Sequence, residues 1–137
     1  MEKYRFIDDL TSDVMFEAYG KGMKDVFANA AEAMFTVICH INKVRPKKAL
    51  AIEAEAENAG KLMIAWLQEL IAAVDIEGMF FSKFDILEIS EKHIMARCWG
   101  EKVSPEKGET VVKAVTYHKY LFEKTTEGYL TRVVLDI

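Results

Sequence analysis

The last seven residues of the chain, 131–137, constrain its fold more than any other stretch. They read Thr-Arg-Val-Val-Leu-Asp-Ile, a run rich in β-branched residues. Such a run usually pairs inside a β-sheet, whereas an untethered terminus is usually polar and frayed. Alternate side chains of a strand point to opposite faces, so Leu135 and Ile137 share one face and Asp136 lies on the other. The pattern predicts a C-terminal strand that is held in a sheet.

This strand places two negative charges next to each other, the side chain of Asp136 and the α-carboxylate of Ile137. Two like charges about 4 Å apart repel by about 4 kcal/mol at an effective dielectric constant of about 20. Two interpretations are open. Both carboxylates face water, which is the commoner arrangement for surface acids, or a cation binds between them.

Length and charge limit the classes of function. The 137 residues are 51% hydrophobic and 29% charged, as expected for one globular domain spanning residues 1–137. A chain of this size buries enough surface to form a core without disulfides or metals. The net charge of -4 argues against duplex nucleic acid as a direct ligand, because phosphate binding requires a basic surface, and it favours a protein partner or a cation.

The two cysteines, Cys39 and Cys98, have no spacing typical of a zinc or redox site and lie among apolar residues. We therefore expect free, inert core thiols. We expect no signal peptide before Tyr4, and no apolar run in the sequence reaches membrane-spanning length. The expected location is the reducing cytoplasm, with no membrane contact.

Hydrophobic periodicity divides the chain into strands and two helices. Strands are predicted at residues 4–7, 14–19, 50–57, 80–89, 94–99, 111–117, 120–124 and 129–137. Helices are predicted at 23–40 and from an N-cap at Asn58 to a left-handed turn near Gly78. Residues 100–110 form a long loop. The expected fold class is α+β, with two main helices packed on a mainly antiparallel β-sheet in a single domain.

Common catalytic motifs are missing from the sequence, including the P-loop, the dinucleotide-binding glycine motif and the serine-hydrolase elbow. The three histidines are expected in structural positions: His40 at a helix end, His93 in a hairpin turn and His118 at a strand end. We therefore expect no covalent catalysis.

Carboxylates at strand ends remain as candidate functional groups: Asp13 near the start, with Asp136 and the α-carboxylate of Ile137 at the end. Hard oxygen donors of this kind suit Ca²⁺ or Mg²⁺ and suit zinc poorly. Spacing alone does not bring the two ends of the chain together.

Several segments together resemble the archease family, in the family's order and over essentially the whole chain. They are Tyr4-x-Phe6-Ile7-x-x-x-Thr11-Ser12-Asp13-Val14, Trp66-Leu67-x-Glu69-Leu70-Ile71, Glu77-Gly78-x-Phe80-Phe81, Lys113-Ala114-Val115-Thr116-Tyr117-His118 and Leu135-Asp136-Ile137. The Lys-Ala-Val-Thr-Tyr-His block and the Asp-Ile ending are specific in combination.

The resemblance implies a non-enzymatic activator of the tRNA-splicing RNA ligase that joins 2',3'-cyclic-phosphate or 3'-phosphate ends to 5'-hydroxyl ends. Such an activator promotes guanylylation and multiple turnover of the ligase. The resemblance also implies a divalent metal site built from Asp13, Asp136 and the terminal carboxylate of Ile137. Ca²⁺ is the expected ion, with Mg²⁺ or Mn²⁺ as alternatives.

Two positions depart from the family pattern, because Leu10 and Gly108 stand where family members usually have histidine. Their joint loss suggests one shared role that this protein lacks or fills otherwise. Two other functions stay open: a chaperone-like modulator of tRNA-modifying enzymes such as methyltransferases, and a stand-alone metal-dependent hydrolase. The hydrolase is disfavoured because no base or nucleophile accompanies the carboxylates. The expected partner is the ligase rather than a specific nucleic acid, and homo-oligomerisation is an open alternative.

Overall fold

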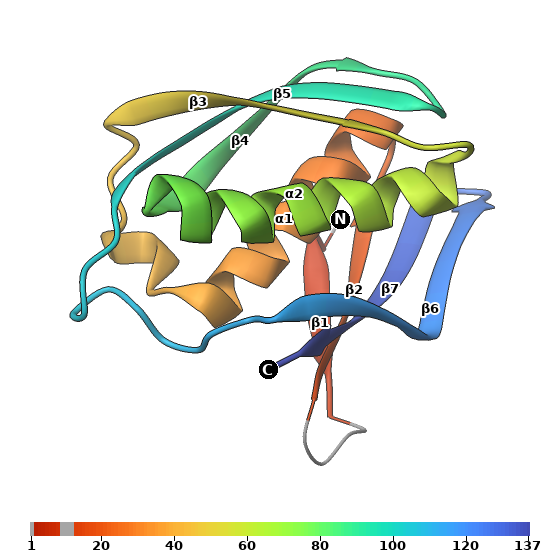
Figure 1. Ribbon diagram of the computed structural model, residues 1–137. Helices are drawn as coiled ribbons and strands as arrows, with labels where there is room; N and C mark the ends of the chain where they lie inside the picture. The colour runs from red at the N-terminus through yellow and green to blue at the C-terminus, as the bar shows by residue number, and fades with distance from the viewer. Residues whose placement is uncertain (1, 9–12) are drawn as a thin grey trace.

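The computed structural model describes residues 2–8 and 13–137. Its elements in chain order are β1 (Tyr4–Ile7), β2 (Val14–Gly20), α1 (Met23–Ile38), the 3-10 helix η1 (Ile41–Lys43), β3 (Lys48–Glu55), α2 (Ala59–Glu77), β4 (Met79–Ile89), β5 (His93–Lys102), β6 (Ala114–Thr125) and β7 (Gly128–Asp136). Two α-helices and seven strands in these residues confirm the predicted α+β class (Figure 1). The predicted turn between β1 and β2 lies largely outside the described residues.

The described strands form two antiparallel sheets, with the orders β1-β2-β7-β6 and β3-β5-β4. Helix α1 contacts β2 and β4, and α2 contacts β3 and β6, so the helices lie between the two sheets (Figure 1). The sequence predicts one sheet beneath the helices. Periodicity identifies strands but does not specify their partners, so the division into two sheets was not predictable from it.

The helix boundaries follow local chemistry. The Asn58 side chain accepts a hydrogen bond of 2.9 Å from the backbone N–H of Lys61, which confirms the predicted N-cap. Gly78 ends α2 in the left-handed conformation at φ 64°, also as predicted. The first helix ends at Ile38 rather than at His40, because Cys39 becomes extended and forms a β-bridge with Gly108. No helix in the described part of the chain is long and apolar enough to cross a membrane.

The long loop lies later in the chain than the sequence predicts. Strand β5 continues through Gly100 to Lys102, and the loop extends to the residue before Ala114. A side chain at Gly100 would meet the backbone oxygen of Phe80 at 1.8 Å. This glycine therefore permits close strand pairing and does not mark the start of a loop.

Strand β6 replaces the two strands predicted at 111–117 and 120–124. Its pairing with β7 shifts register between Thr116 and Leu121, and Lys119 in this interval has a positive φ of 55°. The chain bends here without reversing direction, and Figure 1 shows β6 turning sharply part-way along its length. The bend explains why periodicity is interrupted although the strand continues.

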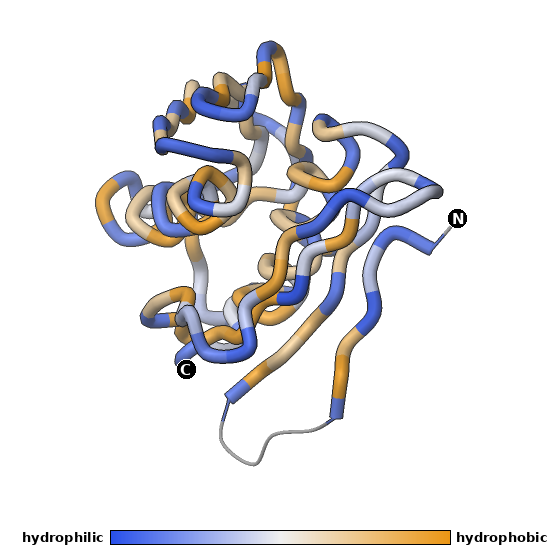
Figure 2. Tube along the Cα trace, turned by 90° about the vertical axis from the view of Figure 1, so that its right-hand side faces the viewer, coloured by the Kyte–Doolittle hydropathy of each residue, from blue (hydrophilic) through white to orange (hydrophobic). Residues whose placement is uncertain are grey.

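The core lies between the sheets and consists of large apolar side chains. Fully buried members include Phe16, Phe27, Phe35, Trp66 and Phe81. Polar and apolar residues are interspersed along the individual elements, as expected for elements with one buried face (Figure 2).

The two cysteines belong to this core. Cys39 and Cys98 are free and buried, which confirms the prediction of core thiols. Burial raises the pKa of each thiol to about 12. Both sulfurs therefore stay protonated and unreactive at neutral pH.

Candidate metal centre

Two carboxylates from opposite ends of the sequence lie at the same end of neighbouring strands. Asp13 directly precedes β2, and Asp136 is the last residue of β7. The two strands are antiparallel, and Val14 pairs with Leu135 at this end. Asp13 comes just before Val14 and Asp136 just after Leu135, so both lie at the same end of the two strands. The register supplies the proximity that sequence spacing could not.

Strand β6 fixes the backbone of Asp136 from the other side. Ala114 pairs with Asp136, and the backbone N–H of Lys113 donates to the Asp136 carbonyl oxygen at 2.7 Å. Ile137 follows directly and is 37% exposed. Strand β7 is therefore paired on both sides as far as Leu135, and on the β6 side as far as Asp136. This agrees with the strand that the β-branched run predicts.

The oxygen donors at this position are available to a ligand. Asp13 and Asp136 are both half-buried. Neither side chain forms an ion pair or hydrogen bond with another residue in the described ranges. Carboxylates that lie at the same strand end without protein partners match the preference of Ca²⁺ for hard anionic ligands. The donor set therefore fits a hard divalent cation.

A buried charge network joins the strands that carry these carboxylates. Glu17, with an 8% exposed side chain, is directly opposite Arg5 of β1 and Arg132 of β7. Its carboxylate accepts from Arg132 Nε at 3.1 Å and Nη2 at 3.0 Å, and from the Tyr19 hydroxyl at 2.9 Å. Burial opposes the ionised form, but the Tyr19, Arg132 and Arg5 interactions outweigh it and lower the Glu17 pKa. The network holds β1, β2 and β7 in register next to the candidate centre.

We predict that Glu17→Gln lowers the free energy of unfolding by roughly 1–3 kcal/mol at pH 7, because two arginines lose their counter-charge. Because the pKa of Glu17 is lower in the folded protein than its ordinary value of 4.5, the ionised carboxylate stabilises the fold at pH values above 4.5. This stabilisation is lost as the pH falls through the pKa of Glu17 in the folded protein. Urea unfolding should therefore show the gap between variant and parent closing below pH 4.5. Glu127→Gln, at an exposed position, is the matched control. A gap that is equally large at pH 7 and in acid would contradict this account.

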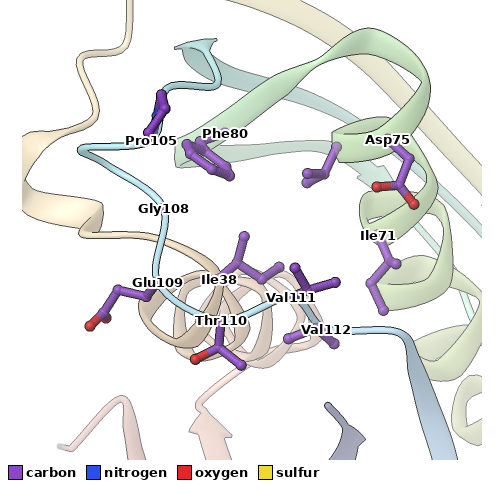
Figure 3. Close-up of a pocket in the computed structure, with 11 residues that line it drawn as sticks. Ile38, Ile71, Asp75, Phe80, Pro105, Gly108, Glu109, Thr110, Val111 and Val112 are labelled. Atoms are coloured by element: carbon purple, nitrogen blue, oxygen red, sulfur yellow. The ribbon is translucent and has the colours of Figure 1, made fainter.

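Gly108, where the resemblance noted in the sequence implies a histidine, lines a cavity of about 320 Å³ (Figure 3). Apolar residues from α1, α2 and the long loop form most of its wall, and Asp75 and Glu109 lie on opposite sides in this view. A Cβ at Gly108 would meet the Phe80 ring at 3.5 Å, an ordinary contact, so a side chain is sterically tolerated there. Leu10, the other such position, lies outside the described residues.

The three histidines lie at separate places in the fold. His40 lies in the connection after α1, where its backbone N–H donates to the Lys107 carbonyl at 2.7 Å. The backbone N–H of His118, in the bend of β6, donates to the Thr116 hydroxyl oxygen at 3.3 Å. His93 is the first residue of β5 rather than part of the hairpin turn.

Sequence reasoning missed one cluster, formed by His93 with Glu53 and Glu55. Its only signal in the sequence was the pair of glutamates two residues apart in the predicted strand 50–57. Because strand pairing was unknown, nothing in the sequence placed His93 beside them.

Comparison with known proteins gives a consistent result. The model of the Archease protein family matches residues 4–137. A protein named archease from Sulfurisphaera tokodaii is 37% identical over 141 residues, covering 100% of both chains. An archease from Pyrococcus abyssi is 38% identical over 133 residues, covering 93% of this chain and 94% of the relative.

Solved structures share the fold. Protein 1598 of Methanobacterium thermoautotrophicum, solved in solution, has a TM-score of 0.82 at 31% identity, with 100% of both chains covered. The crystal structure of a Thermotoga maritima archease, described as a possible chaperone, has a TM-score of 0.68 at 18% identity and covers 97% of both chains. At that identity the second likeness bears on the fold alone.

Proposed function

The chain belongs to the archease family, and we propose that it is a non-enzymatic activator of the tRNA-splicing RNA ligase that joins 2',3'-cyclic-phosphate or 3'-phosphate ends to 5'-hydroxyl ends. It promotes guanylylation of the ligase and lets each ligase molecule turn over repeatedly. The observation that carries this proposal is the match over residues 4–137, combined with the meeting of Asp13 and Asp136 at one strand end.

Asp13, Asp136 and the α-carboxylate of Ile137 would hold one divalent cation, with Ca²⁺ first and Mg²⁺ or Mn²⁺ as alternatives. The bound ion supplies positive charge that offsets the mutual repulsion of the carboxylates. The chain's own contribution is to position these oxygens at the end of a strand that is paired on both sides. The absence of protein partners for the two aspartates in the described ranges supports this role.

The charge of the protein supports a protein partner. The net charge is -4, whereas a ligase that holds RNA must have a basic binding channel. Opposite charges accelerate association and orient the partners. The acidic end formed by β2 and β7 would therefore face the ligase near its metal- and nucleotide-binding site.

The deciding experiment measures guanylylation of a purified ligase with and without this protein. We expect more guanylylated ligase and more joined RNA per ligase molecule when the protein is present. The protein alone, incubated with RNA ends or phosphoesters, should show no turnover. If guanylylation is unchanged while the specificity of a tRNA methyltransferase changes, the chaperone-like alternative would replace the activator role.

We predict that Asp13→Asn weakens Ca²⁺ binding roughly tenfold or more, because an anionic oxygen donor is lost. Ligase activation should fall with it, and the free energy of unfolding without metal should change by only about 0.5 kcal/mol, since the residue lies outside the core. Isothermal titration calorimetry and the guanylylation assay measure the two effects. Asp85→Asn, at an exposed position in β4, is the matched control. Equal Ca²⁺ affinity in the Asp13 variant and the parent would remove Asp13 from the site.

A further inference from the structure

A second cluster of potential metal ligands lies in the other sheet, at the junction of β3 and β5. Glu53 and Glu55 are exposed residues of β3, which is an edge strand, and His93 is the first residue of β5. Glu55 pairs directly with His93. One ligand atom from each of the three side chains lies within 4.8 Å of the others.

The backbone around His93 is held firmly. Its N–H donates to the Ser90 hydroxyl oxygen at 3.2 Å, and its carbonyl accepts from the Ser90 N–H at 2.8 Å. On the β3 side, the N–H of Ala56 donates to the Lys92 carbonyl at 3.0 Å. The imidazole is oriented as well, because Nε2 lies 2.5 Å from Oε2 of Glu53. The donors are therefore positioned by a paired sheet rather than by a loose loop.

The local charge is strongly negative. No lysine or arginine in the described residues forms an ion pair with Glu53 or Glu55, and Glu88 of β4 adds a third carboxylate near the imidazole. Glu91 and Lys92 in the adjoining turn carry opposite charges. The pKa of His93 is raised, chiefly because its imidazole donates a hydrogen bond to the Glu53 carboxylate. Burial partly opposes this rise, and the charges of Glu53, Glu55 and Glu88 add to it. The cluster thus attracts positive charge, either a proton or a metal ion.

We propose that Glu53, Glu55 and His93 form a binding site for a divalent transition-metal ion, with Zn²⁺ as the ion to test. An imidazole nitrogen favours Zn²⁺ over Ca²⁺, and two carboxylates complete three protein ligands. The fourth position of a tetrahedral ion stays open to water or to a donor from another molecule. This site differs in chemistry from the oxygen-only centre at Asp13 and Asp136, and it joins the edge strand β3 to β5.

The test uses the full chain, stripped of metal with EDTA and titrated with ZnCl₂ by calorimetry at neutral pH. We expect the parent to bind one equivalent and both His93→Gln and Glu53→Gln to bind at least about tenfold more weakly. His118→Gln, which alters an exposed histidine outside the cluster, should bind as the parent does. The Asp13→Asn variant should also bind Zn²⁺ as the parent does, and excess Ca²⁺ should not displace the bound Zn²⁺. These two results would show that the Zn²⁺ site is separate from the proposed Ca²⁺ site.

Two further readouts distinguish a metal site from a surface ion pair. Zn²⁺ should raise the melting temperature of the parent but not that of His93→Gln, because the ion links two strands only when the imidazole is present. Binding should weaken as pH falls through the His93 pKa, since proton and metal compete for the same nitrogen. Metal-free stability should change little in His93→Gln, because ion pairs at the protein surface contribute little to stability.

The proposal is overturned if the parent gives neither a Zn²⁺ binding heat nor a rise in melting temperature. It is also overturned if His93→Gln binds Zn²⁺ as tightly as the parent. Should His93→Gln fail to fold, Glu55→Gln gives the same decision, because it removes a ligand from an exposed strand position.

Discussion

One glycine added after Ile137 should abolish Ca²⁺ binding and ligase activation. The added residue moves the terminal carboxylate by ~3.4 Å along the strand direction. Oxygen ligands lie about 2.3–2.6 Å from Ca²⁺, so a displacement of this size removes the donor completely. Metal-free melting should stay almost unchanged, because the pairing of β7 with β2 and β6 ends at Leu135 and Asp136.

Two controls isolate the carboxylate in this experiment. Ile137→Val keeps the α-carboxylate in place and alters only a side chain that is 37% exposed, so binding should be retained. An N-terminal tag should also be tolerated, because it precedes β1. If the glycine-extended protein binds Ca²⁺ and stimulates the ligase as well as the parent does, the α-carboxylate is not a ligand.

Trp66→Ala should lower the free energy of unfolding by roughly 3–5 kcal/mol, the largest stability effect that we predict. The Trp66 side chain is fully buried in α2, and its indole N–H donates to the Phe27 carbonyl of α1 at 3.0 Å. The substitution therefore leaves a cavity between the helices and removes a link between them. The melting temperature should fall by roughly 10–20 °C.

Trp66→Phe is the matched variant, because it keeps an aromatic ring while it loses the indole N–H and part of the buried ring volume. We expect it to recover a substantial part of the stability in urea unfolding. Ligase activation by Trp66→Ala should remain normal at temperatures where the variant is folded. A variant with normal melting but no activity would mean that Trp66 contacts the partner instead of supporting the core.

Local chemistry made several elements predictable. Asn58 and Gly78 fixed the ends of α2, because a side-chain cap and a left-handed residue act on their immediate neighbours. Errors arose where a residue's role depends on a distant segment. Gly100 suggests a loop in the sequence but allows the backbone of Phe80 to approach, and Cys39 ends α1 by bridging to Gly108.

For the candidate centre, the carboxylates and a C-terminal strand capable of holding them were predictable, because both follow from residue type and alternation over a few neighbouring positions. The folded structure was needed to bring Asp13 to the same strand end as Asp136 and to place His93 near Glu53 and Glu55. The reason is physical. Side-chain alternation is a property of one strand, whereas register is set by pairing and packing between strands that are distant in sequence.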